Sequence, residues 1–260
     1  MAFQIIRHAF SMIFGNFGQA LRVSLVPFGV LVGAFLLVML AWDDRLEQMG
    51  RGLDEELIGP AASAADLLAI LGLIALFLFV FSWVAVSWHR FILLEEYSGV
   101  VPAVSDRPIL PYLLRSLLYA LVLLVVSIPV LLISSFLLVP FFESGLELIG
   151  NIIMLIASAV MTYVWLRIGL ALPSVAVGQP ISIRQAWAAS APLSGTIFQV
   201  AFLLMVINSA AVFLSDPMYA VGWVFGVAVD LFTQWLVIML GVSILTTLYG
   251  HLIEKRALIS

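Results

Sequence analysis

One carboxylate lies inside the last long apolar run of the chain, and it carries the clearest chemistry in the sequence. Asp230 follows Tyr219, near the expected outer end of that run, by about 16 Å of helix at ~1.5 Å per residue. A carboxylate at that depth in a bilayer is costly unless it is paired, hydrated or protonated. Gln234 lies one turn later on the same helical face, and Asn208 in the preceding apolar run reaches a comparable depth. We therefore predict an intramembrane polar site formed by Asp230, Gln234 and Asn208.

Two roles fit this polar site. In the first, the three side chains hold helices together by hydrogen bonds, and Gly222 and Gly226 on the same face allow a close helix approach. In the second, Asp230 binds a proton or a cation in a transporter. The packing role is favoured, because a coupled transporter usually has more than one buried acid or base and this chain offers one.

The remaining candidates for chemistry are three histidines, His8, His89 and His251, near the ends of apolar runs. We expect them to be interfacial polar residues, because a zinc site would need all three within about 2.1 Å of one ion. The sequence has no P-loop, HExxH or GxSxG motif. It also has no cysteine, which excludes disulfides and thiolate chemistry. These observations predict a protein that is not an enzyme and has no catalytic residue, metal or cofactor.

Tryptophan followed two residues later by arginine occurs twice, each time where an apolar run ends. The pairs are Trp88 with Arg90 and Trp165 with Arg167. Tryptophan favours the membrane–water interface, and a nearby arginine can extend to lipid phosphates or to helix-end carbonyls. We therefore expect these four residues to be interfacial anchors.

The composition indicates that membrane helices position these residues. Of 260 residues, 64% are hydrophobic and 10% are charged, whereas soluble domains have about 45–50% and about 25%. A helix needs about 20 apolar residues to cross a bilayer. The runs that are long enough are 23–42, 66–88, 112–139, 147–173, 197–215 and 219–249. The predicted fold is an all-α membrane protein with six transmembrane helices.

The basic residues predict the orientation of these helices. Most of them lie at the two termini or in the loops after the second and fourth spans: Arg7, Arg22, Arg90, Arg107, Arg115, Arg167, Arg184, Lys255 and Arg256. Only Arg45 and Arg51 lie on the other side, in the acidic loop 43–65, which we expect to be solvated; a docking or cation-attracting surface is the alternative. The positive-inside rule then places both termini in the cytoplasm.

Each pair of spans follows a segment with an amphipathic helical pattern. Residues 3–19 form the first, Pro111 opens the second, and Ser182 with Gln185 forms a capping box at the start of the third. The Trp-x-Arg pairs recur after 77 residues. Tyr249 follows 84 residues later as a degenerate third copy. We predict one polytopic domain with three two-helix pseudo-repeats, at about 1–97, 98–178 and 179–260, and amphipathic interfacial helices on the cytoplasmic side.

Three segments resemble known families. Residues 167–177 and 182–190 read RIGLALPSVAV and SIRQAWAAS, and they are similar to bacterial six-span proteins of the YciC type. They are also similar to the membrane domain found with some glycerophosphodiester phosphodiesterases. Residues 9–17, AFSMIFGNF, resemble the opening segment of the same families. The resemblance implies a six-span fold and a location in the bacterial inner membrane, and it supplies no reaction.

These features favour a non-catalytic membrane component, such as an accessory, scaffold or lipid-organising subunit. The expected partners are membrane lipids and other integral membrane proteins, with no nucleic acid. The alternative is a transporter of a small solute or a lipid that uses Asp230. A membrane-embedded lipid enzyme is a third hypothesis, which a polar cluster around Arg90, Arg167 and His251 would favour.

Overall fold

The computed structural model describes residues 1–42, 64–143 and 145–258, and the regular secondary structure of these ranges is entirely helical. Six helical segments are long and apolar enough to cross a membrane: Phe17–Ala41, Ala64–Leu94, Ile109–Leu138, Leu148–Ala176, Ile183–Val221 and Trp223–Leu252. The prediction of an all-α protein with six membrane-spanning helices is confirmed. Most of the acidic loop 43–65, with Arg45 and Arg51, lies outside the described residues.

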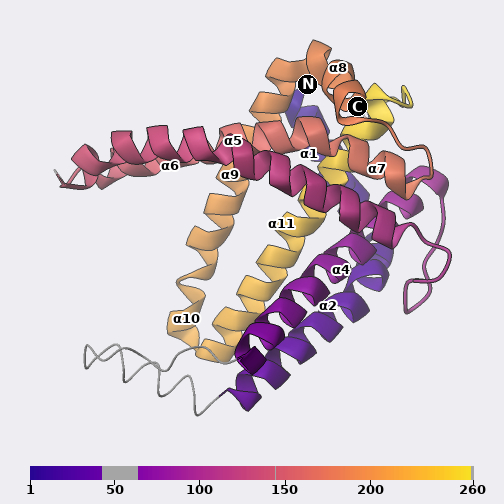
Figure 1. The fold of residues 1–260 in the computed structure, drawn as a ribbon, viewed down its shortest axis with the longest axis horizontal. Helices are drawn as coiled ribbons and strands as arrows, with labels where there is room; N and C mark the ends of the chain where they lie inside the picture. The colour runs from indigo at the N-terminus through magenta and orange to yellow at the C-terminus, as the bar shows by residue number, and fades with distance from the viewer. Residues whose placement is uncertain (43–63, 144, 259–260) are drawn as a thin grey trace.

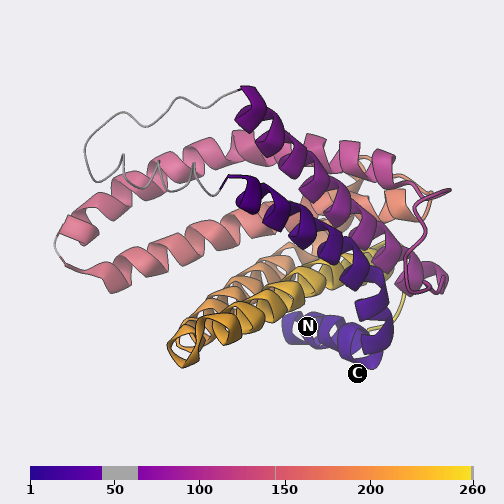
Figure 2. The same cartoon turned by 90° about the horizontal axis from the view of Figure 1, so that it is seen from below.

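The long helices form three hairpins that share one end and diverge toward the other (Figure 1, Figure 2). The hairpins pair α2 (Phe17–Ala41) with α4 (Ala64–Leu94), α5 (Ile109–Glu143) with α6 (Glu147–Gly169), and α9 (Ser194–Ser215) with α11 (Trp223–Leu252). Three short helices gather at the shared end: α1 (Ala2–Gly15), α7 (Ala171–Ala176) and α8 (Ile183–Ser190). We call this end, where both chain termini also lie, the hub.

Local sequence signals explain several helix boundaries. The Ser182 hydroxyl accepts from the Gln185 amide, and the Gln185 side chain accepts from the Ser182 amide, so the predicted capping box opens α8. The sixth span begins at Trp223, because a separate short helix, α10 (Met218–Val221), precedes it. The Tyr219 ring of α10 lies so close to Gly226 that an added Cβ would be 2.5 Å from it. Gly226 therefore accommodates α10.

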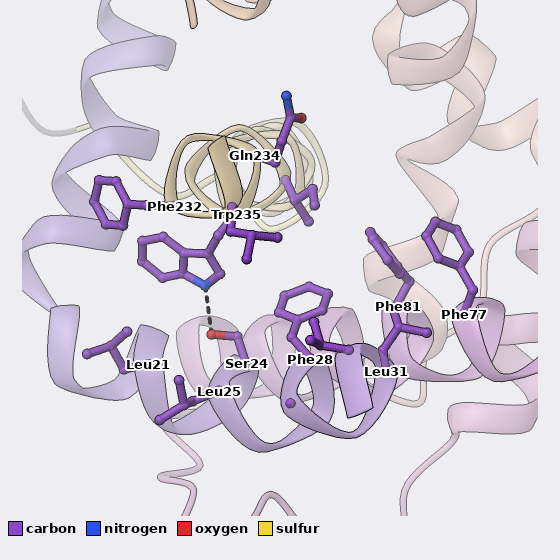
Figure 3. Close-up of a pocket in the computed structure, with 14 residues that line it drawn as sticks. Leu21, Ser24, Leu25, Phe28, Leu31, Phe77, Phe81, Phe232, Gln234 and Trp235 are labelled. Carbon is purple, nitrogen blue, oxygen red and sulfur yellow. Dashed lines mark hydrogen bonds between the residues drawn. The ribbon is translucent and has the colours of Figure 1, made fainter. Parts of the chain in front are cut away.

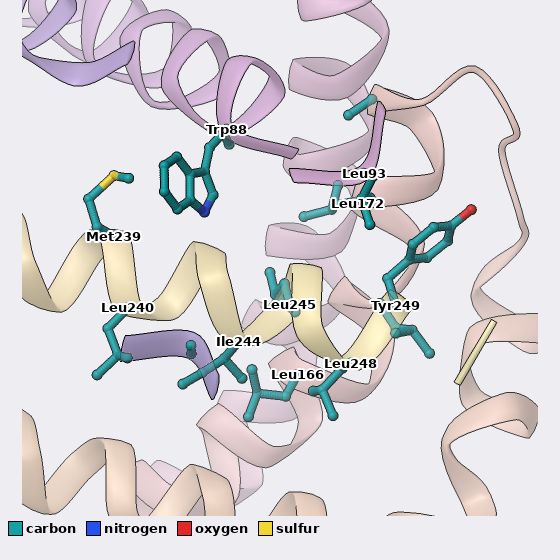
Figure 4. Close-up of a cluster of buried hydrophobic side chains, with 14 of the residues drawn as sticks. Trp88, Leu93, Leu166, Leu172, Met239, Leu240, Ile244, Leu245, Leu248 and Tyr249 are labelled. Carbon is teal, nitrogen blue, oxygen red and sulfur yellow. The ribbon is translucent and has the colours of Figure 1, made fainter. Parts of the chain in front are cut away.

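Burial is concentrated at the hub. The largest fully buried side chains come mostly from α1 and from the hub ends of α4, α6 and α11, as Figure 4 shows for Trp88, Leu166, Ile244 and Tyr249. The outer ends of the hairpins instead expose large apolar side chains, such as Phe136 and Phe213. Such surfaces suit hydrocarbon, which is as apolar as the side chains themselves. The three hairpins are thus held together mainly at one end.

Helix α1 uses its apolar face within this hub. Ile5, Ile6, Ala9 and Ile13 are buried, and α1 packs against α11 and α9. The amphipathic pattern of residues 3–19 predicts a helix in the membrane interface. In the structure, protein covers the buried face of that helix, because the hub ends of α9 and α11 lie against it.

Candidate functional site

Two hydrogen bonds join the ends of α4 and α11 at the hub, one made by Trp88 and the other by His89. Trp88 is completely buried, and its indole Nε1 donates to Ser243 Oγ at 2.9 Å. The sequence predicts Trp88 at the lipid interface, but the structure places it inside the protein. The physical reason is that an indole N–H needs an acceptor, and Ser243 of α11 supplies one within the hub. Trp165, at the matching position of α6, is half-buried.

His89 forms a directional chain of hydrogen bonds across three helices. Its Nδ1 lies 2.8 Å from Thr246 Oγ1 of α11, and its Nε2 lies 3.2 Å from the Tyr112 hydroxyl of α5. Thr246 donates its own proton to the Val242 carbonyl at 2.9 Å. Thr246 must therefore accept from Nδ1–H, which leaves Nε2 to accept from Tyr112. The chain fixes His89 as the neutral Nδ1–H tautomer with both ring nitrogens satisfied, and its role is to join α4, α5 and α11.

Arg90 joins the end of α4 to α7 and to the following loop. Its Nη1 donates to the Ala176 carbonyl at 2.7 Å, while Nε and Nη2 bind the two carboxylate oxygens of Glu96 at 3.0 and 2.6 Å. Arg107 binds the same carboxylate. Bidentate arginine–carboxylate pairs are among the stronger polar contacts in proteins. Arg90 thus anchors protein segments rather than extending only toward lipid.

Arg167 is buried at the contact between α6 and α8, and each of its nitrogens meets a neutral acceptor. Nε donates to Ser190 Oγ at 2.9 Å, Nη1 to the Tyr163 hydroxyl at 3.0 Å, and Nη2 to the Trp187 carbonyl at 2.7 Å. The guanidinium also stacks on the Trp187 ring, 3.7 Å from its centroid. In the described part of the chain no carboxylate pairs with Arg167. Its contacts fix α8 to the end of α6.

The third arginine at the hub is one that the repeat pattern misses. His251 occupies the position that matches Arg90 and Arg167, but Arg256 reaches across to α4, where its Nη2 donates to the Leu93 carbonyl at 2.7 Å. The chain turns after α11, and the His251 Nδ1–H donates to the Arg256 carbonyl at 3.0 Å. Because the turn displaces the arginine by five residues, spacing alone does not reveal it. The only signal in the sequence is a basic residue just beyond the last helix.

The three histidines do not come together. His89 lies within the α4–α5–α11 chain described above, whereas His8 and His251 line one cavity together with Arg256. Among residues 1–42, 64–143 and 145–258, no group of three or more histidine or acidic side chains could hold a metal ion.

The predicted polar site around Asp230 is only loosely assembled. Asp230 accepts from the Ser215 hydroxyl, at 3.4 Å, and no hydrogen bond joins it to Gln234 or Asn208 in the described structure. Since α11 begins at Trp223, only about 10 Å of helix at ~1.5 Å per residue separates Asp230 from the outer end of the span. Asp230 is half-buried, and it lies closer to the outer end of the span than the sequence predicts.

Replacing Asp230 by asparagine separates the two roles of this residue. If Asp230 only packs helices, the amide oxygen of Asp230→Asn still accepts from Ser215, and unfolding should change by less than about 1 kcal/mol. If Asp230 carries a proton or a cation, the variant should fold equally well and lose proton or cation flux into proteoliposomes. Thermal unfolding and flux are measured on the same preparation. A large loss of stability would contradict both roles.

An apolar cavity lies between the first and third hairpins. A groove of about 490 Å³ is lined by α2, α4 and α11, including Phe28, Phe77, Phe81 and Trp235 (Figure 3). Its inner wall is held by one polar contact, in which Trp235 Nε1 donates to Ser24 Oγ at 2.8 Å. Gln234 borders the groove, and its amide points away from this contact (Figure 3).

The groove continues along the diverging first hairpin. A second apolar cavity of about 660 Å³ shares Leu31, Val32 and Phe77 with it and extends between α2 and α4 to Phe35 and Leu73. Sequence reasoning missed this feature, because its walls come from three helices whose divergence no local pattern encodes. A tryptophan and a serine inside apolar runs, at Trp235 and Ser24, are the only sequence signals that point to it.

Comparisons with protein-family models, with curated proteins and with solved structures find no match for this chain. The resemblance to YciC-type proteins therefore stays a prediction that rests on three short segments.

Proposed function

We propose that this chain is a non-catalytic, lipid-organising component of a membrane. The observation that carries the proposal is the apolar groove between α2, α4 and α11, which continues between the diverging arms of the first hairpin. Its walls belong to helices that are long and apolar enough to cross a bilayer. The medium around such helices is lipid hydrocarbon, so the occupant of the groove is a lipid acyl chain.

The chemistry of the walls supports an acyl chain over a polar solute. The lining consists of leucine, isoleucine, valine and phenylalanine side chains together with Gly29, Gln234, and the Ser24–Trp235 pair. That pair satisfies the indole N–H internally, while the Ser24 hydroxyl donates to the Ala20 carbonyl at 2.6 Å. Charged groups are absent from this lining, and Asp230 does not contribute to it. A groove with these walls holds a flexible apolar chain through dispersion contacts.

Filling the groove is expected to expel the acyl chain. A Cβ at Gly29 meets no atom within 4 Å, so Gly29→Phe should fold normally while its ring occupies the groove. In nanodiscs made with acyl-brominated lipids, bromine in the groove quenches Trp235. The fluorescence quenching that is due to Trp235 is obtained by subtracting the quenching of the Trp235→Phe variant from that of the parent chain. Gly29→Phe should remove most of that quenching.

Gly33 provides the matched control for this experiment. It lies one turn further along α2, has equally open surroundings and lines neither cavity. Gly33→Phe should leave the quenching of Trp235 unchanged. Equal quenching in both phenylalanine variants and in the parent chain would mean that no acyl chain enters the groove.

The three two-helix repeats at 1–97, 98–178 and 179–260 form part of the same proposal, and the hub arginines support them. Arg90 of the first unit binds the Ala176 carbonyl of the second, and Arg167 of the second binds the Trp187 carbonyl of the third. Arg256 of the third unit closes the cycle on the Leu93 carbonyl of the first. This cyclic order is what a threefold arrangement of related units would produce.

We further propose that the hub faces the cytoplasm of a bacterial cell, with the chain in the inner membrane. Of the basic residues, nine gather at the termini and at loops on the hub side of the spans. Alkaline phosphatase fused after Ser260 should be inactive, and the same enzyme inserted within 43–65 should be active. The reverse pattern would invert this orientation, and with it the cytoplasmic assignment of the hub.

A further inference from the structure

Three basic side chains from three segments line one cavity at the hub. The cavity has a volume of about 190 Å³ and is bordered by His8 of α1, His251 at the end of α11, and Arg256 beyond it. The rest of its lining is neutral and consists of Met12, Ile92, Leu93, Thr246, Thr247, Gly250, Ala257 and Leu258. At ~30 Å³ per water molecule, this is room for roughly six waters. The cavity is therefore large enough for a polyatomic anion.

The threonine hydroxyl protons at the cavity are used within the protein, so a ligand would be bound by the nitrogen groups of Arg256 and His251. Thr246 and Thr247 donate their hydroxyl protons to the backbone, to the Val242 and Ser243 carbonyls at 2.9 and 2.8 Å. His251 uses its Nδ1–H on the Arg256 carbonyl. Its Nε2 can therefore donate to a ligand only when the imidazole is protonated. An anionic ligand favours this second proton, because it stabilises the positive charge of the protonated imidazole.

The charges around the cavity agree with an anionic ligand. Arg256 pairs with Glu254 through Nε, at 2.6 Å, and donates to the Ile92 and Leu93 carbonyls through Nη1 and Nη2, at 3.5 and 2.7 Å. Each of its two Nη groups keeps a second proton for a ligand. The neighbouring Lys255 turns away and donates to the Leu252 carbonyl. Burial, and then repulsion from His251, hold the pKa of His8 below its usual value. An anion between the two imidazoles would turn this repulsion into attraction.

The junction that contains Arg167 differs from the junction at this cavity. Between the second and third units, the guanidinium of Arg167 fills the space between α6 and α8 and stacks on Trp187. Between the third and first units, the shorter His251 stands at the matching position and leaves the cavity beside α1. We propose that this cavity binds a phosphate group, which occupies the space beside His251 where the matching position of the second unit carries the Arg167 guanidinium. Phosphate accepts several charge-assisted hydrogen bonds at once, as this arrangement of donors requires.

The phosphate belongs either to a lipid headgroup or to a free anion, and histidine NMR distinguishes the two. The chain has only three histidines, so ¹³C-labelled imidazoles give three signals, and the buried His89 serves as an internal reference. The full chain is studied in maltoside detergent with added inorganic phosphate. It is also studied in phosphatidylcholine nanodiscs with and without phosphatidic acid. Bound phosphate should raise the pKa of His8 by about 1 unit in a saturable manner, because it favours the protonated imidazole.

A response to phosphatidic acid alone identifies a lipid headgroup, and a response to inorganic phosphate in detergent identifies the free anion. An unchanged His8 titration under every condition overturns the proposal. This site is independent of the acyl groove, because the two share no lining residue. Failure of one proposal therefore leaves the other standing.

Three variants separate a defined site from general surface charge. His251→Asn and Arg256→Gln should each weaken the binding that shifts His8 by roughly tenfold, since each removes a charged donor. Lys255→Gln removes the same charge as Arg256→Gln from a residue outside the lining, and it should bind as the parent chain does. If Lys255→Gln weakens binding as much as Arg256→Gln, the defined site is wrong. His251→Asn keeps the test valid if loss of the Arg256–Leu93 contact unfolds the hub.

Discussion

Trp88→Ala is expected to lower the free energy of unfolding by about 3–5 kcal/mol. The Trp88 side chain is completely buried, packs against the Phe91 ring at 5.6 Å between centroids, and donates to Ser243. Its removal leaves a cavity where α4 meets α11, and packing is the main force that holds membrane helices together. Trp88→Phe keeps most of the volume and loses the hydrogen bond, so it should cost about 1 kcal/mol for that bond together with a smaller cavity term.

Trp223→Ala is the matched control for this effect. Trp223 begins α11 at the opposite end of the molecule and is 72% exposed. Its replacement should change stability by no more than about 0.5 kcal/mol. All three variants are compared by denaturant unfolding in one detergent. Equal losses for Trp88→Ala and Trp223→Ala would contradict the conclusion that packing at the hub holds the hairpins together.

The fold was largely predictable, because the bilayer sets a minimum length that composition reveals directly. Runs such as 23–42 and 112–139 are apolar enough that no other placement is favourable, and each overlaps an observed span in all but its last residue. The capping box of Ser182 and Gln185 was predictable for a local reason, since its donors and acceptors lie within one turn. The start of the sixth span was not predictable, because it depends on the packing of α10 against α11 at Gly226, and no local pattern in the sequence encodes that contact.

The details of the hub were not predictable from spacing. A tryptophan at a helix end has the same sequence signature whether it faces lipid headgroups or a neighbouring helix, and Trp88 takes the second position. His89 shows the same ambiguity. Its place near a helix end predicts how deep it lies in the membrane, but it does not predict its partners Thr246 and Tyr112, which lie on two other helices. The repeat pattern does not identify Arg256, because the chain turns after His251 and places the arginine five residues beyond the matching position.

The contrast between the hub and the outer ends links stability to the proposed function. Hydrogen bonds of Trp88, His89 and Arg167 cross between segments at one end, while residues such as Phe136 and Phe213 face the surroundings at the other. Elements with few buried contacts open at low free energy. The arms that line the apolar groove can therefore adapt to a bound lipid, as the proposed function requires, while the hub holds their shared ends in place.

The second large effect is expected at the junction between the second and third units. Arg167→Gln should lower the free energy of unfolding by about 2–4 kcal/mol, because the shorter amide cannot reach Ser190, Tyr163 and the Trp187 carbonyl together. Arg167→Lys should recover little of this loss. An ammonium group keeps the charge, but it cannot stack flat on Trp187 while donating in three fixed directions.

The location of the damage tests this explanation further. Amide hydrogen exchange should accelerate in α8 and at the end of α6 in both Arg167 variants, and it should stay slow around His89, where different contacts join the helices. Arg184→Gln is the control, since Arg184 lies on α8 with its side chain exposed. In Arg184→Gln, the free energy of unfolding and the free energies of opening obtained from hydrogen exchange should stay within about 0.5 kcal/mol of the parent chain. A fully stable Arg167→Lys variant would show that charge alone matters at this junction, and the fork of hydrogen bonds would then not be what fixes α8 to α6.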